Sequence, residues 1–333
     1  MALSPEELRV ELRRAGIANA AVDAIWPQWW SSDAEASLSA TAELTFTVAR
    51  RLGLAPRALL DGEARFVWRD ETKYKHLSAK ASDEEAALSS FGCAVARAAQ
   101  QGVPGPAAGW FTAMQIRDSI LKTSAVVDAE SLLVLAWSLG VPVLQLRVFP
   151  LQHKRMHAMS VGVQDRAVIL LARVASYAAP VAFTLAHELG HVMLGHLEGG
   201  EALVDLEDPF LSPELDDDEE VAADRFALQL LTGQTSPQIV VDTDKFTATQ
   251  LAAAAVAQGP ILGIEPGVLA MCAGHSTGEW SKAYGALKII PPGQQDVSTS
   301  INELARRQID WSAVSVDGQD YLHAVMGLPR GDV

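Results

Sequence analysis

Residues 183–191 of this 333-residue chain read FTLAHELGH, and apolar residues on both sides extend the pattern to about 178–197. This apolar run predicts a long helix that carries the sequence H-E-x-x-H. Residues four apart share one face of a helix, so His187 and His191 can both reach a single metal ion. Two neutral imidazoles at this spacing suit Zn²⁺. Glu188 lies beside them and can accept a proton from an attacking water and return it to a leaving amine.

A catalytic zinc site also needs a third protein ligand and one open coordination position. In one known pattern the third ligand is a histidine six residues after the second motif histidine, but here that position is Leu197. His196 lies one residue too early, and we expect it to be a surface histidine of the helix near the site. A carboxylate from a later helix is the other solution.

A later acidic segment offers that carboxylate. The sequence EEVAAD at 219–224 places Glu220 and Asp224 four residues apart on one helical face. We expect Glu220 to bind the metal, and Asp224 to accept a hydrogen bond from the far nitrogen of a ligand histidine. Glu219 is the alternative ligand, although its position beside 216–218 favours solvated charge at a helix N-terminus.

The two motifs together resemble those of the ImmA/IrrE family of zinc metallopeptidases. The resemblance rests on FTLAHELGH at 183–191 and on the pattern ExxADxFAxxLL at 220–231, and it is strong over about 125–232. It implies one catalytic zinc ion, bound by the two motif histidines and by Glu220. It also implies that Glu188 is the general base of a metallo-endopeptidase.

The resemblance further implies a regulatory function. Family members typically cut a partner repressor of the helix-turn-helix type and so release gene expression, and several act after DNA damage. Some accompany anti-phage defence operons, and some of those respond to single-stranded DNA. We therefore expect a helix-turn-helix repressor as substrate and single-stranded DNA as a candidate activator. The alternative is a non-catalytic zinc-containing sensor that regulates the repressor by binding. Glu188 favours the enzyme, because a structural metal site has no use for a general base.

The order of predicted elements indicates an α+β fold. We expect a zincin-like core with a small mixed or antiparallel sheet packed on the H-E-x-x-H helix, flanked by helical regions. An apolar run at 141–148 predicts a buried strand, and the residues around Gln164-Asp165 predict a hairpin. The strand at 168–171 is expected either inside the sheet or as a strand that pairs with an extended substrate. The expected regions are 1–80 (helical N-terminal region), 81–235 (peptidase core) and 236–333 (mostly helical C-terminal region).

Charge restricts the partners of the chain. The stretch 197–224 contains twelve acidic residues and no Lys or Arg, and removing these twelve charges from the net charge of −15 leaves −3. The acidity is therefore local, and a globally basic nucleic-acid-binding protein is excluded. The stretch from 37 to 60 resembles the last two helices of a helix-turn-helix repressor domain, so the N-terminal region is interpreted as a degenerate relative of that domain.

A local site for nucleic acid remains open in the sequence. Cations and aromatic rings alternate after the N-terminal helices, a mixture that suits single-stranded nucleic acid because rings stack on bases and cations contact phosphates. The alternative is a pair of amphipathic surface strands. The candidate contact residues are Arg65, Trp68, Arg69, Lys73, Tyr74 and Lys75.

The two cysteines, Cys93 and Cys272, cannot form a disulfide framework, and the N-terminus lacks the basic and apolar regions of a secretory signal. The sequence contains no apolar run of about 18 residues that predicts a membrane span, so we expect a cytoplasmic protein. A regulatory peptidase needs an inactive state, and a thiolate can block zinc. We expect Cys93, which precedes the predicted core, as the inhibitory ligand in preference to Cys272. The alternative is that each cysteine is a small buried apolar residue.

A peptidase also needs a donor that stabilises the oxyanion of the tetrahedral intermediate. Tyrosine and histidine side chains can supply it, and the sequence does not choose among them. The candidates are Tyr177, His153, His157, His275 and His323.

Overall fold

The computed structural model describes residues 3–67, 82–103, 109–151, 156–197, 202–205, 218–237, 246–292 and 296–329. The helices of the N-terminal half are α1 (Pro5–Arg14), α2 (Asn19–Ile25), α3 (Leu38–Leu52), α4 (Pro56–Leu60), α5 (Ser82–Gln100), α6 (Ala113–Ile120) and α7 (Ala129–Ser138). Those of the second half are α8 (Ala178–Leu194), α9 (Asp218–Thr232), α10 (Ala248–Leu262), α11 (Pro266–Thr277), α12 (Trp280–Leu287), α13 (Val297–Gln308) and α14 (Val316–Met326). The strands are β1 (Val143–Gln145), β2 (Ala158–Val163), β3 (Arg166–Leu171) and β4 (Ala202–Asp205).

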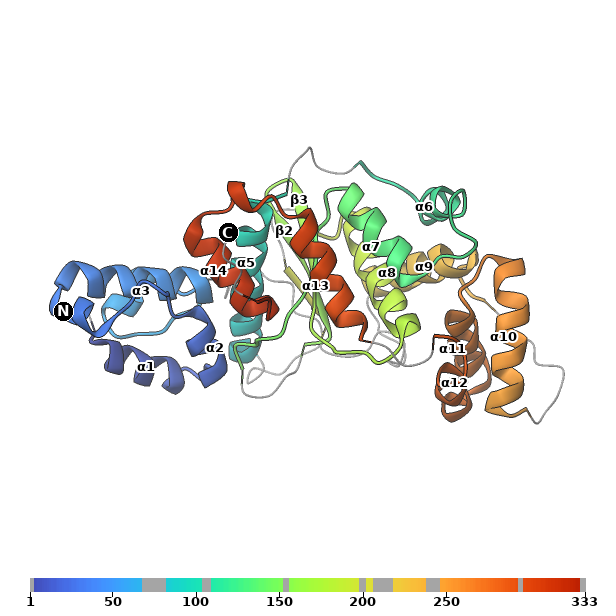
Figure 1. Cartoon of the computed structure of the whole chain (residues 1–333), viewed down its shortest axis with the longest axis horizontal. Helices are drawn as coiled ribbons and strands as arrows, with labels where there is room; N and C mark the ends of the chain where they lie inside the picture. Colours follow the sequence, from blue (N-terminus) through green and yellow to red (C-terminus); the bar gives the residue numbers. More distant parts are fainter. Residues whose placement is uncertain are drawn as a thin grey trace.

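These elements form a mostly helical α+β fold around one small mixed sheet. Figure 1 shows the N-terminal helices at one end of the molecule, the strands in the middle, and α10 to α12 at the other end. The fold class expected from the sequence is therefore confirmed at this level. None of the helices in the described part of the chain combines the length and the apolarity needed to cross a lipid bilayer.

The sheet has the strand order β1-β3-β2-β4. β1 runs parallel to β3, whereas β2 pairs antiparallel with both β3 and β4. The predicted hairpin is present, with Val163 opposite Arg166 on the two sides of the turn. β3 has a partner strand on each side, so residues 168–171 cannot pair with an extended substrate. Of the two interpretations of this strand, the interior one is correct.

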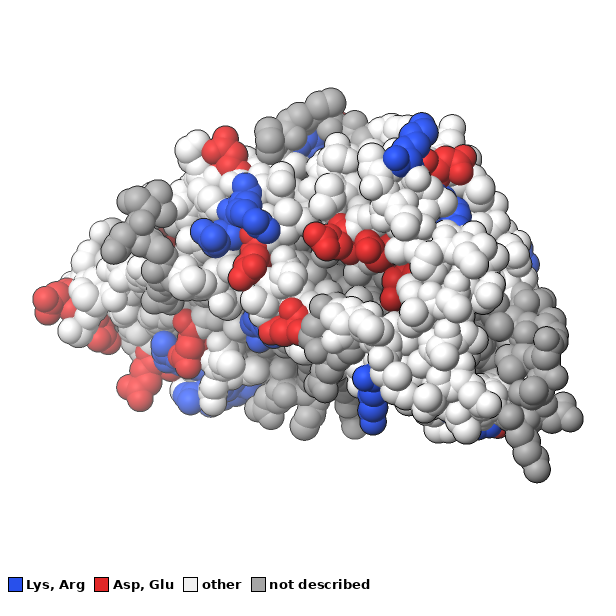
Figure 2. All heavy atoms as spheres, turned by 45° about the vertical axis from the view of Figure 1, so that its right-hand side comes forward, with Lys and Arg blue, Asp and Glu red and all other residues white. Residues whose placement is uncertain are grey.

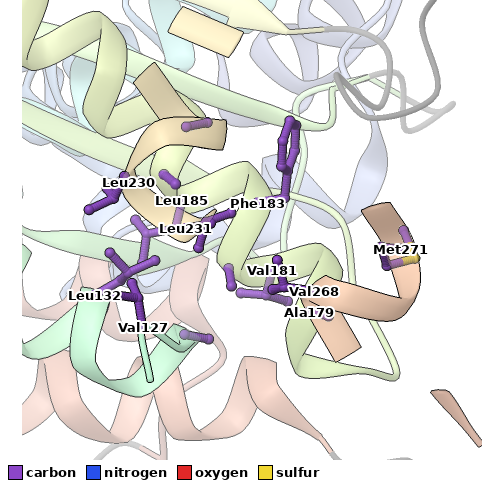
Figure 3. Close-up of a cluster of buried hydrophobic side chains, with 14 of the residues drawn as sticks. Val127, Leu132, Ala179, Val181, Phe183, Leu185, Leu230, Leu231, Val268 and Met271 are labelled. Carbon is purple, nitrogen blue, oxygen red and sulfur yellow. The ribbon is translucent and has the colours of Figure 1, made fainter. Parts of the chain in front are cut away.

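Alternating side chains of the strands bury both faces of the sheet. Ile169 and Leu171 join one hydrophobic cluster, and Val168 and Leu170 join another, as the period of two along a strand requires. The first cluster is built around α8 with α7, α9 and α11, and Figure 3 shows part of it. The second contains α5, α14 and the N-terminal helices. The H-E-x-x-H helix α8 and α5 thus cover opposite faces of the sheet (Figure 1).

The N-terminal helices begin and end at residues with clear local signals. Ser4 and Glu7 form a capping box at the start of α1. α3 ends at Gly53, which has a φ of 67°, and α4 follows as a helix of five residues. A Cβ at Gly53 would collide with the backbone of Ser90 in α5. The glycine therefore both ends α3 and allows α5 to pack closely against it.

The last two helices return to the sheet and to the N-terminal helices. Asn302 of α13 accepts from the backbone N of Gln145 at 2.9 Å and donates to its carbonyl oxygen at 2.8 Å, so its side chain covers the outer edge of β1. Asp317 of α14 accepts a hydrogen bond of 2.6 Å from the buried guanidinium of Arg51 in α3. The C-terminal region is helical, as predicted, but α13 and α14 pack on β1 and α5, far from α10 to α12.

Arg117 of α6 holds three helices together from a buried position. Its guanidinium donates four hydrogen bonds, all to carbonyl oxygens at the ends of α9 and α10, where helix carbonyls have no intrahelical partner. The acceptors are Leu230 at 3.2 Å, Leu231 at 2.8 Å, Leu262 at 3.0 Å and Gly263 at 2.9 Å. A cation is also favourable at the negative ends of two helix dipoles. This contact fixes the end of the helix that presents Glu220.

Candidate metal centre

The predicted site lies where α8 and α9 cross closely. Gly190 of α8 permits the approach, because a Cβ there would lie only 3.1 Å from the carbonyl oxygen of Ala223 and 3.3 Å from Cβ of Phe226. His187 and His191 share one face of α8, and Glu220 and Asp224 share one face of α9. The crossing brings these two faces together.

Three side chains converge at this crossing. His187, His191 and Glu220 form a buried group whose ligand atoms all lie within 4.8 Å of one another, so it could hold one metal ion. The Nε2 atoms of the two imidazoles are 3.0 Å apart. Glu220 Oε2 lies 3.2 Å from Nε2 of His187, and Glu220 Oε1 lies 3.4 Å from Nε2 of His191. Glu219, the alternative ligand in the sequence, lies in the first turn of α9 and is not a member of this group.

The outer nitrogens of both imidazoles have their own partners. Asp224 Oδ1 lies 2.8 Å from Nδ1 of His187, which is the contact expected from the spacing of Glu220 and Asp224. An ionised carboxylate only accepts, so Nδ1 of His187 donates and its Nε2 carries a lone pair. Nδ1 of His191 lies 2.9 Å from Nδ1 of His196. In the tautomer of His191 whose Nε2 could bind a metal, Nδ1 is the donor of this contact. Both Nε2 lone pairs then point toward Glu220.

This arrangement fits a divalent cation. Two imidazole lone pairs and an ionised carboxylate repel one another in a buried place unless a positive charge lies between them. Two nitrogens and one carboxylate oxygen are a donor set found in catalytic zinc sites, whereas Mg²⁺ and Ca²⁺ prefer oxygen alone.

Glu188 points to the sheet rather than to α9. Its side chain is buried, with 1% of the residue exposed, and its Oε2 accepts a hydrogen bond of 2.5 Å from Oγ of Ser160 in β2. The carboxylate is therefore fixed between α8 and β2, one residue along the helix from His187. Ser160 was not predicted as a site residue. The available signal was a polar side chain among the apolar residues of a buried strand.

His196 lies near the site, as expected, but after the end of the helix and not on its surface. α8 ends one turn earlier than predicted, because Gly195 has a φ of 80° and turns the chain back. The backbone N of His196 then donates to the carbonyl oxygen of His191 at 3.1 Å, and its imidazole contacts that of His191. His196 is thus a neighbour of a candidate ligand.

The candidate oxyanion donors are spread over the molecule. His157 precedes β2, and its Nε2 lies 2.8 Å from Oγ1 of Thr184, one helical turn before His187. Tyr177 precedes α8, ten residues and therefore about 15 Å along the helix axis from His187. His275 is exposed on α11, and His323 of α14 stacks on Trp311 with ring centroids 4.5 Å apart. His153 lies outside the described residues.

Neither cysteine is placed at the three ligands. Cys93 lies on α5 in the hydrophobic cluster on the face of the sheet opposite α8. Cys272 lies on α11 in the cluster around α8, where burial raises the pKa of its thiol to about 12. The structure thus does not bring the proposed inhibitory residue Cys93 to the site, because the sheet separates the two. Both side chains fit the alternative interpretation as small buried residues.

Most of the candidate nucleic-acid contacts lie outside the described residues, namely Trp68, Arg69, Lys73, Tyr74 and Lys75. Arg65 is described and exposed, and its carbonyl oxygen accepts a hydrogen bond from the backbone N of Ala55 at 2.8 Å. On the face that Figure 2 shows, the Lys and Arg side chains of the described residues stand apart among acidic ones and form no continuous band.

Comparisons of the chain with models of protein families, with curated proteins and with solved structures find no match.

Proposed function

We propose that this protein is a zinc-dependent endopeptidase with a zincin-like centre. The observation that carries the proposal is the buried convergence of His187, His191 and Glu220 beside a fixed Glu188. When bound, a zinc ion at these three ligands would polarise a peptide carbonyl and acidify water. The zinc identity, the peptidase activity and the zincin-like classification all belong to this proposal.

The side chains of the chain have distinct tasks in the proposed reaction. Glu188 accepts a proton from the attacking water and returns it to the leaving amine. Ser160 holds the carboxylate of Glu188 in one orientation. Asp224 and His196 hold the rings of His187 and His191, which keeps their Nε2 atoms turned toward Glu220.

We propose further that the substrate is a partner repressor of the helix-turn-helix type, and that single-stranded DNA or DNA damage triggers its cleavage. The support for this step is the resemblance of the two motifs to the ImmA/IrrE family, including the branch that accompanies anti-phage defence operons. The repressor-like stretch at 37–60 and the cations near Arg65 are compatible with it.

The test is a cleavage assay with the full chain loaded with zinc. The substrates are a proteome-derived peptide mixture and, where the adjacent gene encodes a small helix-turn-helix protein, that protein, each with and without single-stranded DNA. We expect a cut that Glu188→Gln abolishes while the zinc content stays at one per chain. Glu219→Gln is the matched control, because it removes a carboxylate charge next to Glu220 without touching the ligand group. Zinc binding without any cut that depends on Glu188 would refute the enzyme.

One observation favours the alternative of a non-catalytic sensor. His187 and His191 are 0% exposed and Glu188 is 1% exposed, which is the burial typical of a structural metal site. In that case the chain would bind the repressor without cutting it, and Glu188→Gln would leave the binding unchanged. The same assay therefore separates the two functions.

A further inference from the structure

We propose that a cavity at the C-terminal end of α8 binds one large uncharged side chain, aliphatic or aromatic, of the protein segment that this chain recognises. The cavity has a volume of about 270 Å³. That is below the range of about 300–1,000 Å³ for sites that hold drug-sized ligands, so it suits a single side chain. The assignment as a substrate pocket rests on the proposed peptidase function. The binding itself is tested separately.

Four segments that are distant in sequence build the cavity. They are the end of α8, the turn between β2 and β3, the connection from α7 to β1, and the residues before α6. Residues from all four segments line the cavity, among them Trp110, Val141, Gln164, Ala167, Val192 and Leu197. A cavity shared by four segments keeps its shape through the packing of the core, because Val141 and Ala167 also belong to the cluster around α8.

Two lining residues of the cavity directly follow residues of the candidate metal centre in the sequence. Val192 directly follows the candidate ligand His191. Leu197 directly follows His196, whose Nδ1 lies 2.9 Å from Nδ1 of His191. Successive residues of a helix point about 100° apart, so Val192 and Met193 face another side of α8 than His187 and His191. A segment bound in the cavity would therefore reach the centre by passing the C-terminal end of α8.

The chemistry of the walls selects the occupant. Aliphatic side chains of Val141, Ala167, Val192 and Leu197 line the interior, together with Met193. Two charged residues reach the rim. Arg166 donates to the carbonyl oxygen of Val103 at 2.8 Å, and Asp165 is exposed, so the two charges at the rim are opposite in sign. A carboxylate entering this cavity would lose its hydration next to apolar walls, whereas a leucine or phenylalanine side chain would bury apolar area.

Two residues at the rim have features that folding alone does not require. Trp110 is 66% exposed although a ring of this size gains most from burial. Gln164 has a φ of 58° and is the one residue other than glycine with positive φ in the described part of the chain. Two-residue hairpin turns favour glycine or asparagine at such positions, so the glutamine keeps a longer amide at the rim against its backbone preference.

The experiment measures binding of short peptides to the full zinc-loaded chain carrying Glu188→Gln, which is not expected to cut them. The probe is a blocked pentapeptide of alanines with 4-fluorophenylalanine at the third position, observed by fluorine NMR. Unlabelled pentapeptides with Phe, Leu, Glu or Ala at that position compete for binding. We expect the Phe and Leu peptides to displace the probe at least about tenfold better than the Glu peptide.

Variants assign the binding to the cavity. Trp110→Ala should weaken probe binding about fivefold. Trp29→Ala is the matched control, since Trp29 is also exposed, at 44%, but belongs to the N-terminal helices. Gln164→Gly should weaken binding while thermal stability is kept or raised, so a loss of binding cannot be a loss of folding.

The proposal is overturned if no probe binding is detected. Equal displacement by all four peptides, or equal effects of Trp110→Ala and Trp29→Ala, would also overturn it. These outcomes are distinct from failure of the proposed function, because no turnover is measured. Selective peptide binding without any cleavage by the native chain would leave the cavity as the binding site of a sensor.

Discussion

Replacing Asp224 tests whether the contacts behind the imidazoles hold the metal centre together. Asp224 Oδ1 lies 2.8 Å from Nδ1 of His187, and the carboxylate side chain is 38% exposed. Hydrogen bonds to charged groups contribute about 1.5–3 kcal/mol, and partial exposure places this one near the lower end. Since about 1.4 kcal/mol corresponds to a factor of ten, Asp224→Ala should weaken zinc binding by about tenfold to thirtyfold.

The assay is competition for zinc with a chromophoric chelator of known affinity, at constant pH and salt. Asp224→Asn should lose less than Asp224→Ala, because the amide oxygen can still accept from Nδ1 of His187. Asp218→Asn and Asp218→Ala are the matched controls, since Asp218 is exposed in the first turn of the same helix. If Asp224→Ala and Asp218→Ala change the zinc affinity equally, the contact does not position the ligand and the reasoning fails.

Three further predictions concern single residues, namely Ser160, Arg117 and Cys272. Ser160→Ala should lower the turnover number of Glu188-dependent cleavage about tenfold with unchanged zinc content, whereas Ser160→Thr should keep the turnover number. The control is Ser89→Ala, because Ser89 is a buried serine on the other face of the sheet. An equal loss in the control would contradict the role of Ser160. Arg117→Met should lower the free energy of unfolding by about 2–4 kcal/mol in urea titrations, because the lost guanidinium leaves buried carbonyl oxygens without donors. An unchanged midpoint of unfolding would refute this role of Arg117. Cys272 should resist alkylation by iodoacetamide at neutral pH in the native chain and react after unfolding, because burial raises the pKa of its thiol to about 12. Alkylation is measured by mass spectrometry, and a modified Cys272 in the native chain would contradict its burial.

Local rules account for the parts of the fold that the sequence predicts. The turn at Gln164-Asp165 is encoded in adjacent residues, so turn propensity predicts it. The capping box of Ser4 and Glu7 and the end of α3 at Gly53 depend on nearby residues in the same way. The pairing of His187 with His191 is equally local, because it depends only on the period of one helix. β4 was missed because its four residues lie within an acidic stretch that has no strand pattern.

Contacts between distant segments set the limit of prediction. Ser160 and His196 join the site through the register of β2 against α8 and through the turn at Gly195, and no spacing rule covers either. The place of Cys93 depends on which face of the sheet α5 covers, and the chain order does not determine this. For the same reason the sequence could not show that β3 is interior and that α13 covers the edge of β1.

The burial of the candidate centre is itself an argument that its polar residues serve more than the packing of the core. α8 is buried from Val181 to His191, and leucine or alanine at each position would stabilise such a helix. Instead it carries two imidazoles and the carboxylate of Glu188, and α9 adds the carboxylate of Glu220. Buried ionisable groups cost stability unless they are paired or bind a metal, and removing one partner leaves the others uncompensated. A chain that needed only a packed core would lose nothing by replacing all four. Three of the four also contact a further residue, since His187 contacts Asp224, His191 contacts His196 and Glu188 contacts Ser160. Their joint presence at the crossing of two helices therefore points to a function that requires them.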